Sequence, residues 1–256
     1  MGISQASNGS RVVKTLVVCI DGTWNTPGQR DLDPVSGCAV ETRTNVARTW
    51  EIMTGETLDH TRPYGSVAPL KRQLGAALYL SGVGSSGSRL AQCIHGATGR
   101  GLAERIRDAY RFLSERWQPG DRVLGFGFSR GAFAVRSLMG FIEAVGLPKT
   151  NKLVKERELA RLYAMYRKRA CKPVVRPSWT VEAPVQFLGL WDTVGALAFG
   201  HWINGYHAIS PGNVRHVCHA VALDEERKLF WPELWAASNR PGQTVEEVLF
   251  AGSHSN

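Results

Sequence analysis

The sequence has no apolar run close to the roughly 18 residues that a membrane-spanning helix needs. It also lacks an early apolar segment of the kind that a secretory signal carries, so we expect a cytoplasmic protein, with any export by a non-Sec route. Cysteine is scarce: the five cysteines are odd in number and form no Cys-x-x-Cys pair, which predicts reduced thiols. The His-Glu-x-x-His pattern and calcium-loop spacings are missing as well, so we expect neither a metal ion nor a cofactor.

What is present is an ordinary globular composition. The 256 residues are 43% hydrophobic and 21% charged, which is enough for one domain with its own core. The 31 lysines and arginines exceed the 22 acidic residues and give a net charge of +9. That charge favours acidic partners, such as an anionic membrane surface or an acidic protein. Nucleic acid would suit the charge too, but the sequence has no recognition motif for it, and we do not expect it as a partner.

Apolar runs and amphipathic stretches alternate along the chain. We expect strands at Val12–Ile20, Asp121–Phe128, Val185–Trp191 and Val245–Phe250, and helices at 44–54, Gly101–Trp117 and Ser129–Val145. Residues Val214–Trp235 are expected to form a short segment and a helix. The alternation predicts an α/β fold, a mostly parallel sheet with helices on both faces. We expect residues 1–11 to be disordered and 12–256 to form the domain, with 149–184 as a helical, basic, lid-like insert.

The motif GFSRG at residues 127–131 carries the strongest chemical signal in the chain. It follows a hydrophobic strand and opens a helix, which is the context of a nucleophile elbow. Glycines on both sides of Ser129 allow the strand and the helix to pass closely, so that the turn lifts the hydroxyl out of the sheet. We therefore predict Ser129 as a nucleophile; the alternative is that its side chain only caps the helix.

A nucleophilic serine needs a base and a group that orients the base. In this architecture they follow in the order serine, acid, histidine. Asp192 ends a hydrophobic strand, which favours it as the acid over a plain turn residue. His254 also follows a strand, in a loop of small residues, and is favoured as the base; His219 is the alternative base.

The oxyanion of an attacked ester would need two backbone N–H donors. The amide of Arg130, next after the nucleophile, is one candidate, and Gly22 or Thr23, directly after the first strand, supplies the other. We expect Asp21 to orient that loop by accepting backbone hydrogen bonds, rather than to catalyse or bind a metal ion. The glycine-rich segment at 81–88 does not match a phosphate-binding loop and is expected to border the same site.

Several blocks of the sequence, taken together, are characteristic of one family. They are IDGTWN at 20–25, TNV at 44–46, YLSGVGSS at 79–86, GRGL at 99–102, PGDRVLGFGFSRGAFAVRSL at 119–138, GLWDTVGA at 189–196, HAVALDEER at 219–227 and FAGSHSN at 250–256. In this order they resemble the DUF2235 α/β-hydrolases, which include the Tle1-type phospholipase effectors of type VI secretion. The resemblance covers nearly the whole chain.

The resemblance implies an α/β-hydrolase-like fold and a serine ester hydrolase that cleaves a lipid or phospholipid, without a cofactor. It implies Ser129 as nucleophile, Asp192 as acid and His254 as base, with Asp21 and Gly22 shaping the site. It also implies secretion or immunity proteins as partners. The family continues after the histidine with a turn such as HSDVGGGY, whereas this sequence ends at Asn256. The alternative is therefore a truncated, catalytically impaired domain that acts as a basic membrane- or protein-binding module.

Overall fold

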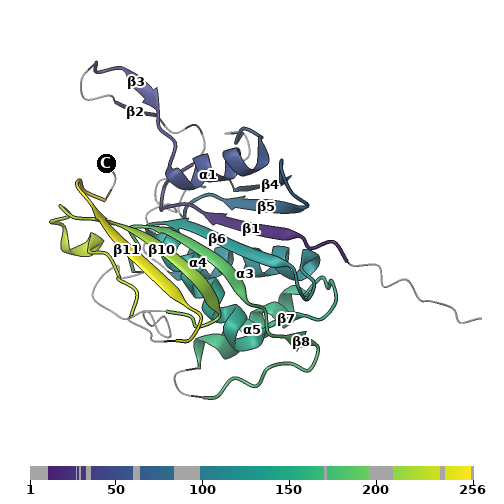
Figure 1. Ribbon diagram of the computed structural model, residues 1–256. Helices are drawn as coiled ribbons and strands as arrows, with labels where there is room; N and C mark the ends of the chain where they lie inside the picture. Colours follow the sequence, from purple (N-terminus) through teal and green to yellow (C-terminus); the bar gives the residue numbers. More distant parts are fainter. Residues whose placement is uncertain are drawn as a thin grey trace, which may run out of the picture.

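The computed structural model describes residues 11–26, 28, 30–32, 36–59, 64–83, 99–169, 172–195, 210–236 and 240–254. At its centre lies a seven-stranded sheet in the order β11-β10-β9-β6-β1-β5-β4 (Figure 1). Its strands are β1 (Thr15–Ile20), β4 (Gly65–Pro69), β5 (Gly75–Leu80), β6 (Arg122–Phe128), β9 (Val185–Trp191), β10 (Val214–Ala222) and β11 (Thr244–Phe250). Every neighbouring pair is parallel except β4–β5. This is the mostly parallel sheet of an α/β fold that the sequence predicts.

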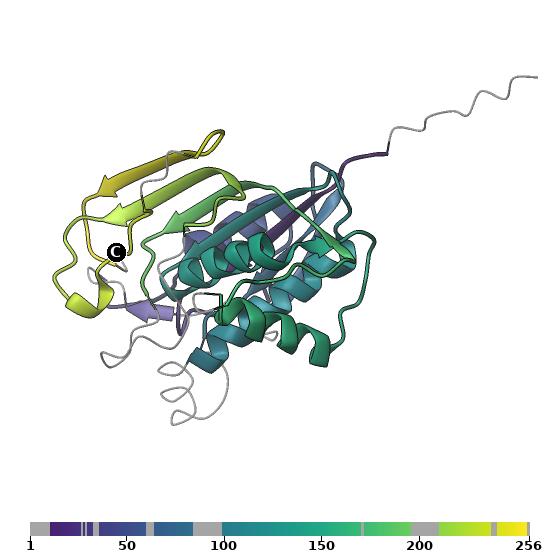
Figure 2. The same ribbon diagram turned by 90° about the horizontal axis from the view of Figure 1, so that it is seen from below.

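Helices cover both faces of the sheet, as predicted (Figure 2). Helix α1 (Asn45–Thr54) packs on β1 and β5 from one side, around Trp50 and Tyr79. On the other side lie α3 (Gly99–Arg116), α4 (Arg130–Val145) and α5 (Glu156–Arg167), whose buried side chains form the larger core. The smaller elements are β2 (Arg30–Leu32), β3 (Ala39–Glu41), β7 (Leu147–Pro148), β8 (Thr180–Val181) and the 3-10 turn η1 (Lys228–Phe230). None of the described helices is long and apolar enough to cross a membrane.

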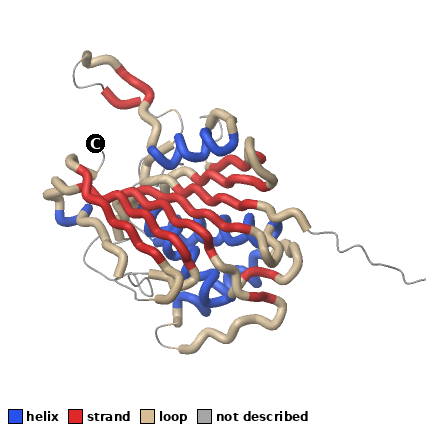
Figure 3. The backbone as a smooth tube through the Cα atoms, viewed as in Figure 1, coloured by secondary structure: helices blue, strands red, loops and turns tan. Residues whose placement is uncertain are grey.

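The central position of β1 follows from its sequence. All six residues, TLVVCI, are buried, because layers of helix cover both faces of the strand. The strands β1, β6 and β9 are parallel neighbours, so their carboxyl ends meet at one edge of the sheet (Figure 3). That edge is where ligands bind in open α/β sheets. It therefore gathers the residues that follow these strands, Asp21, Ser129 and Asp192.

The prediction for Val214–Trp235 is wrong: residues Val214–Ala222 form strand β10, and only the short turn η1 follows. The valines at 214, 217 and 221 are spaced by three and four residues, which also fits one face of a helix. In the folded chain β10 pairs with β9 on one side and β11 on the other. Pairing on both sides, together with β-branched side chains that suit a pleated surface, makes this segment a strand rather than a helix.

Two further predictions concern the ends of the domain and its insert. The predicted disordered segment at 1–11 lies outside the described residues, apart from Arg11. Within the insert at 149–184, α5 places Leu159, Leu162, Tyr163 and Tyr166 in the core shared with α3 and α4. The lid-like role of the insert stays a prediction.

Candidate active site

Ser129 lies in a strained turn between β6 and α4. Its backbone φ of 54° is positive, which costs a residue with a side chain roughly 1–2 kcal/mol. The flanking glycines make the turn feasible, because a Cβ on Gly131 would lie 2.2 Å from the Ile20 carbonyl oxygen, and one on Gly127 would lie 2.6 Å from Ala132. The Ser129 side chain makes no capping hydrogen bond to α4. Its hydroxyl instead lies 2.7 Å from His254 Nε2, so the capping alternative does not describe it.

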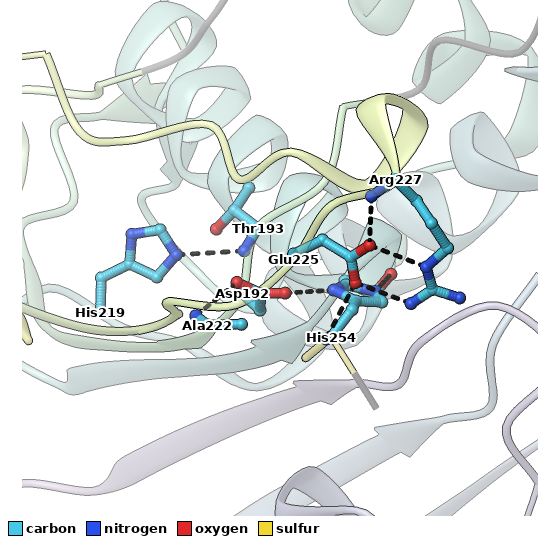
Figure 4. Close-up of polar contacts among 8 residues, drawn as sticks. Asp192, Thr193, His219, Ala222, Glu225, Arg227 and His254 are labelled. Atoms are coloured by element: carbon cyan, nitrogen blue, oxygen red, sulfur yellow. Dashed lines mark hydrogen bonds and ion pairs between the residues drawn. The ribbon is translucent and has the colours of Figure 1, made fainter. Parts of the chain in front are cut away.

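Asp192 lies directly after β9 and also has a positive φ, of 46°. Its backbone N–H donates to Ala220, and its Oδ1 accepts from the backbone N–H of Ala222 at 2.9 Å. The other carboxylate oxygen, Oδ2, forms a hydrogen bond with His254 Nδ1. Asp192 is thus held by β10 on one side and has one oxygen available to orient the histidine (Figure 4).

His254 forms hydrogen bonds with both Ser129 and Asp192. Its Nε2 lies 2.7 Å from the Ser129 hydroxyl, on the opposite side of the ring from the bond to Asp192. The ring is buried between Phe128, at 5.0 Å between ring centroids, and Phe230, at 5.2 Å. The structure therefore brings together the serine, aspartate and histidine that the sequence selects, in a continuous hydrogen-bonded chain.

The loop that carries His254 is fixed by a group that sequence reasoning missed. Glu225 accepts the backbone N–H of His254 at 3.0 Å, and the guanidinium of Arg227 binds both oxygens of the same carboxylate at 2.7 Å (Figure 4). The bond from Arg227 is the main reason that the pKa of Glu225 falls to about 2. One residue earlier, Asp224 accepts the N–H of Gly252 and donates its own N–H to the Gly252 carbonyl. The signal in the sequence is the run of three acidic residues, DEE, at 224–226.

Asp21 organises the loop after β1. Its carboxylate is buried and accepts hydrogen bonds from the Thr44 and Tyr79 hydroxyls and from the backbone N–H of Gly22, each at 2.7 Å. Burial raises the pKa of Asp21, while the three donors act in the opposite direction. Because the Gly22 amide is engaged by Asp21, Thr23 is the better of the two predicted oxyanion donors in this loop. The geometry also agrees with Asp21 as an orienting group.

His219, the alternative base, lies on the far side of Asp192 from His254 (Figure 4). Its Nε2 accepts the backbone N–H of Thr193 at 3.0 Å, and its Nδ1 lies 2.8 Å from a Glu247 oxygen. Both ring nitrogens are therefore occupied by groups other than Ser129. Burial lowers the pKa of His219, which favours the neutral ring.

A cavity of about 830 Å³ opens beside Asp192 and His254, and Ser129 lies behind them and does not line it. Its wall includes Asp192 and His254 and the loop residue Thr23. Large apolar side chains line part of it: Trp24, Phe128, Trp191, Val221 and Phe250. Two arginines, Arg43 and Arg48, line another part. Within the described ranges, no group of three or more His, Cys, Asp or Glu side chains is arranged to hold a metal ion.

Comparison with known proteins gives a family-level match. Residues 14–256 match the family model described as "T6SS, Phospholipase effector Tle1-like, catalytic domain". The chain is similar to the "Uncharacterized protein YEL023C" of Saccharomyces cerevisiae, with 25% identity over 250 residues, covering 89% of this chain and 33% of that protein. The chain thus spans about a third of the length of this relative.

Two solved structures resemble the fold at low identity. One is an uncharacterized protein from Pseudomonas aeruginosa, with a TM-score of 0.45 and 16% identity, covering 95% of this chain and 41% of that one. The other is an inhibited esterase B from Lactobacillus rhamnosis, with a TM-score of 0.41 and 14% identity, covering 96% and 70%.

Proposed function

Because the chain belongs to the family of Tle1-like phospholipase effector catalytic domains, we propose that it is a serine hydrolase that cleaves a carboxylic ester of a phospholipid. The observation that carries the proposal is the hydrogen-bonded chain from Ser129 through His254 to Asp192. A serine hydroxyl becomes a strong nucleophile when a neutral imidazole stands within hydrogen-bond reach to take its proton. The 2.7 Å separation satisfies that requirement.

In the proposed reaction, Ser129 attacks the ester carbonyl while His254 takes the hydroxyl proton. Asp192 holds the imidazole in one tautomer and stabilises the positive charge that the ring acquires. The ring then returns the proton to the leaving alcohol, which leaves an acyl group on Ser129. Water, activated by the same histidine, hydrolyses this acyl-enzyme and regenerates the serine.

The negative charge on the substrate oxygen needs donors that are already in place. We assign these to the backbone amides of Arg130 and Thr23. Arg130 is the first residue of α4, where helix geometry directs backbone N–H groups out of the helix end. Thr23 lies in the loop that Asp21 orients, at the end of the neighbouring strand β1.

The cavity supports an amphiphilic substrate. Its apolar side chains suit an acyl chain, and its two arginines suit a phosphate. Arg43 is already paired with Glu41 and Glu51, whereas Arg48 is exposed and has no ion pair among the described residues. The net charge of +9 favours an anionic membrane as the surface on which such a substrate is found. Family membership further supports secretion or immunity proteins as partners.

Active-site labelling tests the proposal. A fluorophosphonate probe should label the wild-type protein at Ser129, and Ser129→Ala should abolish both labelling and ester hydrolysis without altering the melting temperature. The matched control is Ser36→Ala, at an exposed serine in the turn before β3, which should label and hydrolyse normally. If folded wild-type protein forms no adduct and hydrolyses no phospholipid, the enzyme proposal fails in favour of a basic binding module.

A further inference from the structure

A second carboxylate–histidine pair lies behind the proposed catalytic aspartate. His219, on β10, is 1% exposed, and its ring bridges two groups that are distant in sequence. Nε2 accepts the backbone N–H of Thr193, and Nδ1 bonds to Glu247 on β11. The same Glu247 oxygen also accepts the backbone N–H of Trp235. Figure 4 shows the ring pointing at Thr193, away from His254.

The hydrogen bonds fix the state of this ring. A backbone N–H can only donate, so Nε2 must present a lone pair to Thr193. The single proton of the neutral ring then lies on Nδ1, where it is donated to Glu247. Protonation of Nε2 would replace the bond to Thr193 with a clash of two donors. Arg136 and Asp192 are the other charged groups that act on the ring.

The residue that His219 holds belongs to a turn under strain. Asp192 has a positive φ, and a residue with a side chain keeps that conformation only when its surroundings over-determine it. The next two residues are each anchored. Thr193, which is fully buried, accepts from the N–H of Glu233 at 2.7 Å, and the N–H of Val194 donates to the Ser129 carbonyl at 3.3 Å. Among the groups that anchor residues 193 and 194, the imidazole of His219 is the acceptor that comes from a side chain. It accepts the backbone N–H of Thr193, the residue directly after Asp192.

We propose that His219 is a positioning residue: its neutral ring holds the Thr193 amide, and through it the Asp192 carboxylate, in the orientation that His254 requires. This inference rests on the proposed function of the three residues Ser129, His254 and Asp192. It assigns a role to a histidine that would otherwise count only as a buried polar residue. His219 itself does not contact the substrate.

Two amide substitutions separate this role from general packing. In His219→Gln the side-chain oxygen reaches about as far as Nε2 and can accept from Thr193. In His219→Asn the oxygen corresponds to the nearer Nδ1 and cannot reach it. We expect kcat to fall about 10- to 100-fold in His219→Asn with KM nearly unchanged, since a displacement near 1 Å costs that much. His219→Gln should retain kcat to within about fivefold.

The matched control is His216, on the same strand, whose ring bonds to Thr244 of β11 but is exposed and remote from Asp192. His216→Asn and His216→Gln should both leave kcat unchanged. A second readout needs no substrate: the proton shared by His254 and Asp192 should give a far-downfield NMR resonance. That resonance should persist in His219→Gln and disappear in folded His219→Asn; if His219→Asn does not fold, His219→Leu replaces it.

Equal kcat values in His219→Asn and wild type, or equal losses in the Asn and Gln variants, would overturn the positioning role. So would an unchanged NMR resonance in every folded variant. If the wild-type protein has no esterase activity but the resonance responds as expected, the proposed function fails and the positioning role stands. Loss of His219→Gln activity with the resonance intact would also count against the role.

Discussion

The backbone N–H of His254 donates a hydrogen bond to the carboxylate of Glu225 at 3.0 Å. This bond fixes the main chain of the proposed base from outside the three proposed catalytic residues, because Glu225 is itself held by both the backbone and the guanidinium of Arg227. The Arg227 guanidinium also lies over the Phe230 ring, which packs on His254. The loop after β11 is therefore held in place by hydrogen bonds as far as His254.

Glu225→Ala should lower kcat about 10- to 100-fold and leave KM within about threefold. The substitution removes the acceptor for the His254 amide, so the ring loses its fixed distance to Ser129. Glu226→Ala, at the exposed neighbouring position, is the control and should behave as wild type. Steady-state kinetics on a soluble short-chain ester would measure both. An unchanged kcat in the Glu225 variant would show that the loop does not depend on this bond.

The hydrogen bonds of Glu225 to Arg227 and His254 also predict that the free energy of unfolding depends on pH in the acid range. The pKa of Glu225 falls from 4.5 to about 2, so its contribution to folding is fully present above about pH 4.5 and is lost as the pH falls toward 2. Glu225→Gln removes this titration. The free energy of unfolding, measured by urea denaturation between pH 2 and 6, should therefore fall less steeply with acid in the variant than in the wild type. Parallel curves for the two proteins would contradict the assignment.

Much of the site could be predicted from the sequence because its residues follow strands. Ser129 and Asp192 come directly after apolar strands, and His254 lies four residues after the end of β11. The carboxyl ends of parallel strands meet at one edge of the sheet. The residues that support them could not be found in this way. Glu225 and His219 act through contacts between segments far apart in sequence. The interpretation of Val214–Trp235 as a short segment and a helix also missed the strand that carries His219. The sequence does predict that Asp21 accepts a backbone hydrogen bond in its loop, but only the structure identifies Gly22 as the donor.

Thr44, the N-cap residue of α1, should affect both stability and activity when it is substituted. Its hydroxyl donates to Asp21 and accepts from the N–H of Ala47, so it both caps the helix and supports the oxyanion loop. We expect Thr44→Val to reduce stability by about 1–2 kcal/mol and also to lower kcat. Thr49→Val, an exposed hydroxyl on the same helix, should change stability by less than about 0.5 kcal/mol. Thermal melts and kinetics of the two variants make the comparison; equal effects would refute the special role of Thr44.

A substitution at Gly131 tests whether the turn that carries Ser129 needs the close approach of α4 to the end of β1. A Cβ at this position would lie 2.2 Å from the Ile20 carbonyl oxygen and 2.3 Å from that of Asp21, so Gly131→Ala must push α4 away from the sheet. We expect a loss of about 2 kcal/mol, or roughly 4–8 °C in melting temperature, together with a large fall in kcat. Gly120→Ala, at a turn with a positive φ and open space around it, should lower stability without reducing kcat in the folded enzyme. A normal kcat in Gly131→Ala would show that Ser129 tolerates the shift.

We expect the positive charge of Arg48 to lower KM for a phospholipid but not for a neutral ester. Arg48 is exposed on the wall of the cavity, and among the described acidic residues only Asp192, which binds His254, shares that wall. With monomeric short-chain esters, we expect Arg48→Ala to raise KM about tenfold for a phosphatidylglycerol and to leave the matching diacylglycerol unchanged, since an ion pair to phosphate contributes about 1–2 kcal/mol. Arg72→Ala, which removes the same charge from an exposed turn outside the cavity, is the control and should alter neither substrate. Free inorganic phosphate should inhibit the wild-type protein more than Arg48→Ala. Equal KM changes for both substrates, or equal effects of the two arginines, would mean that the phosphate is not recognised at Arg48.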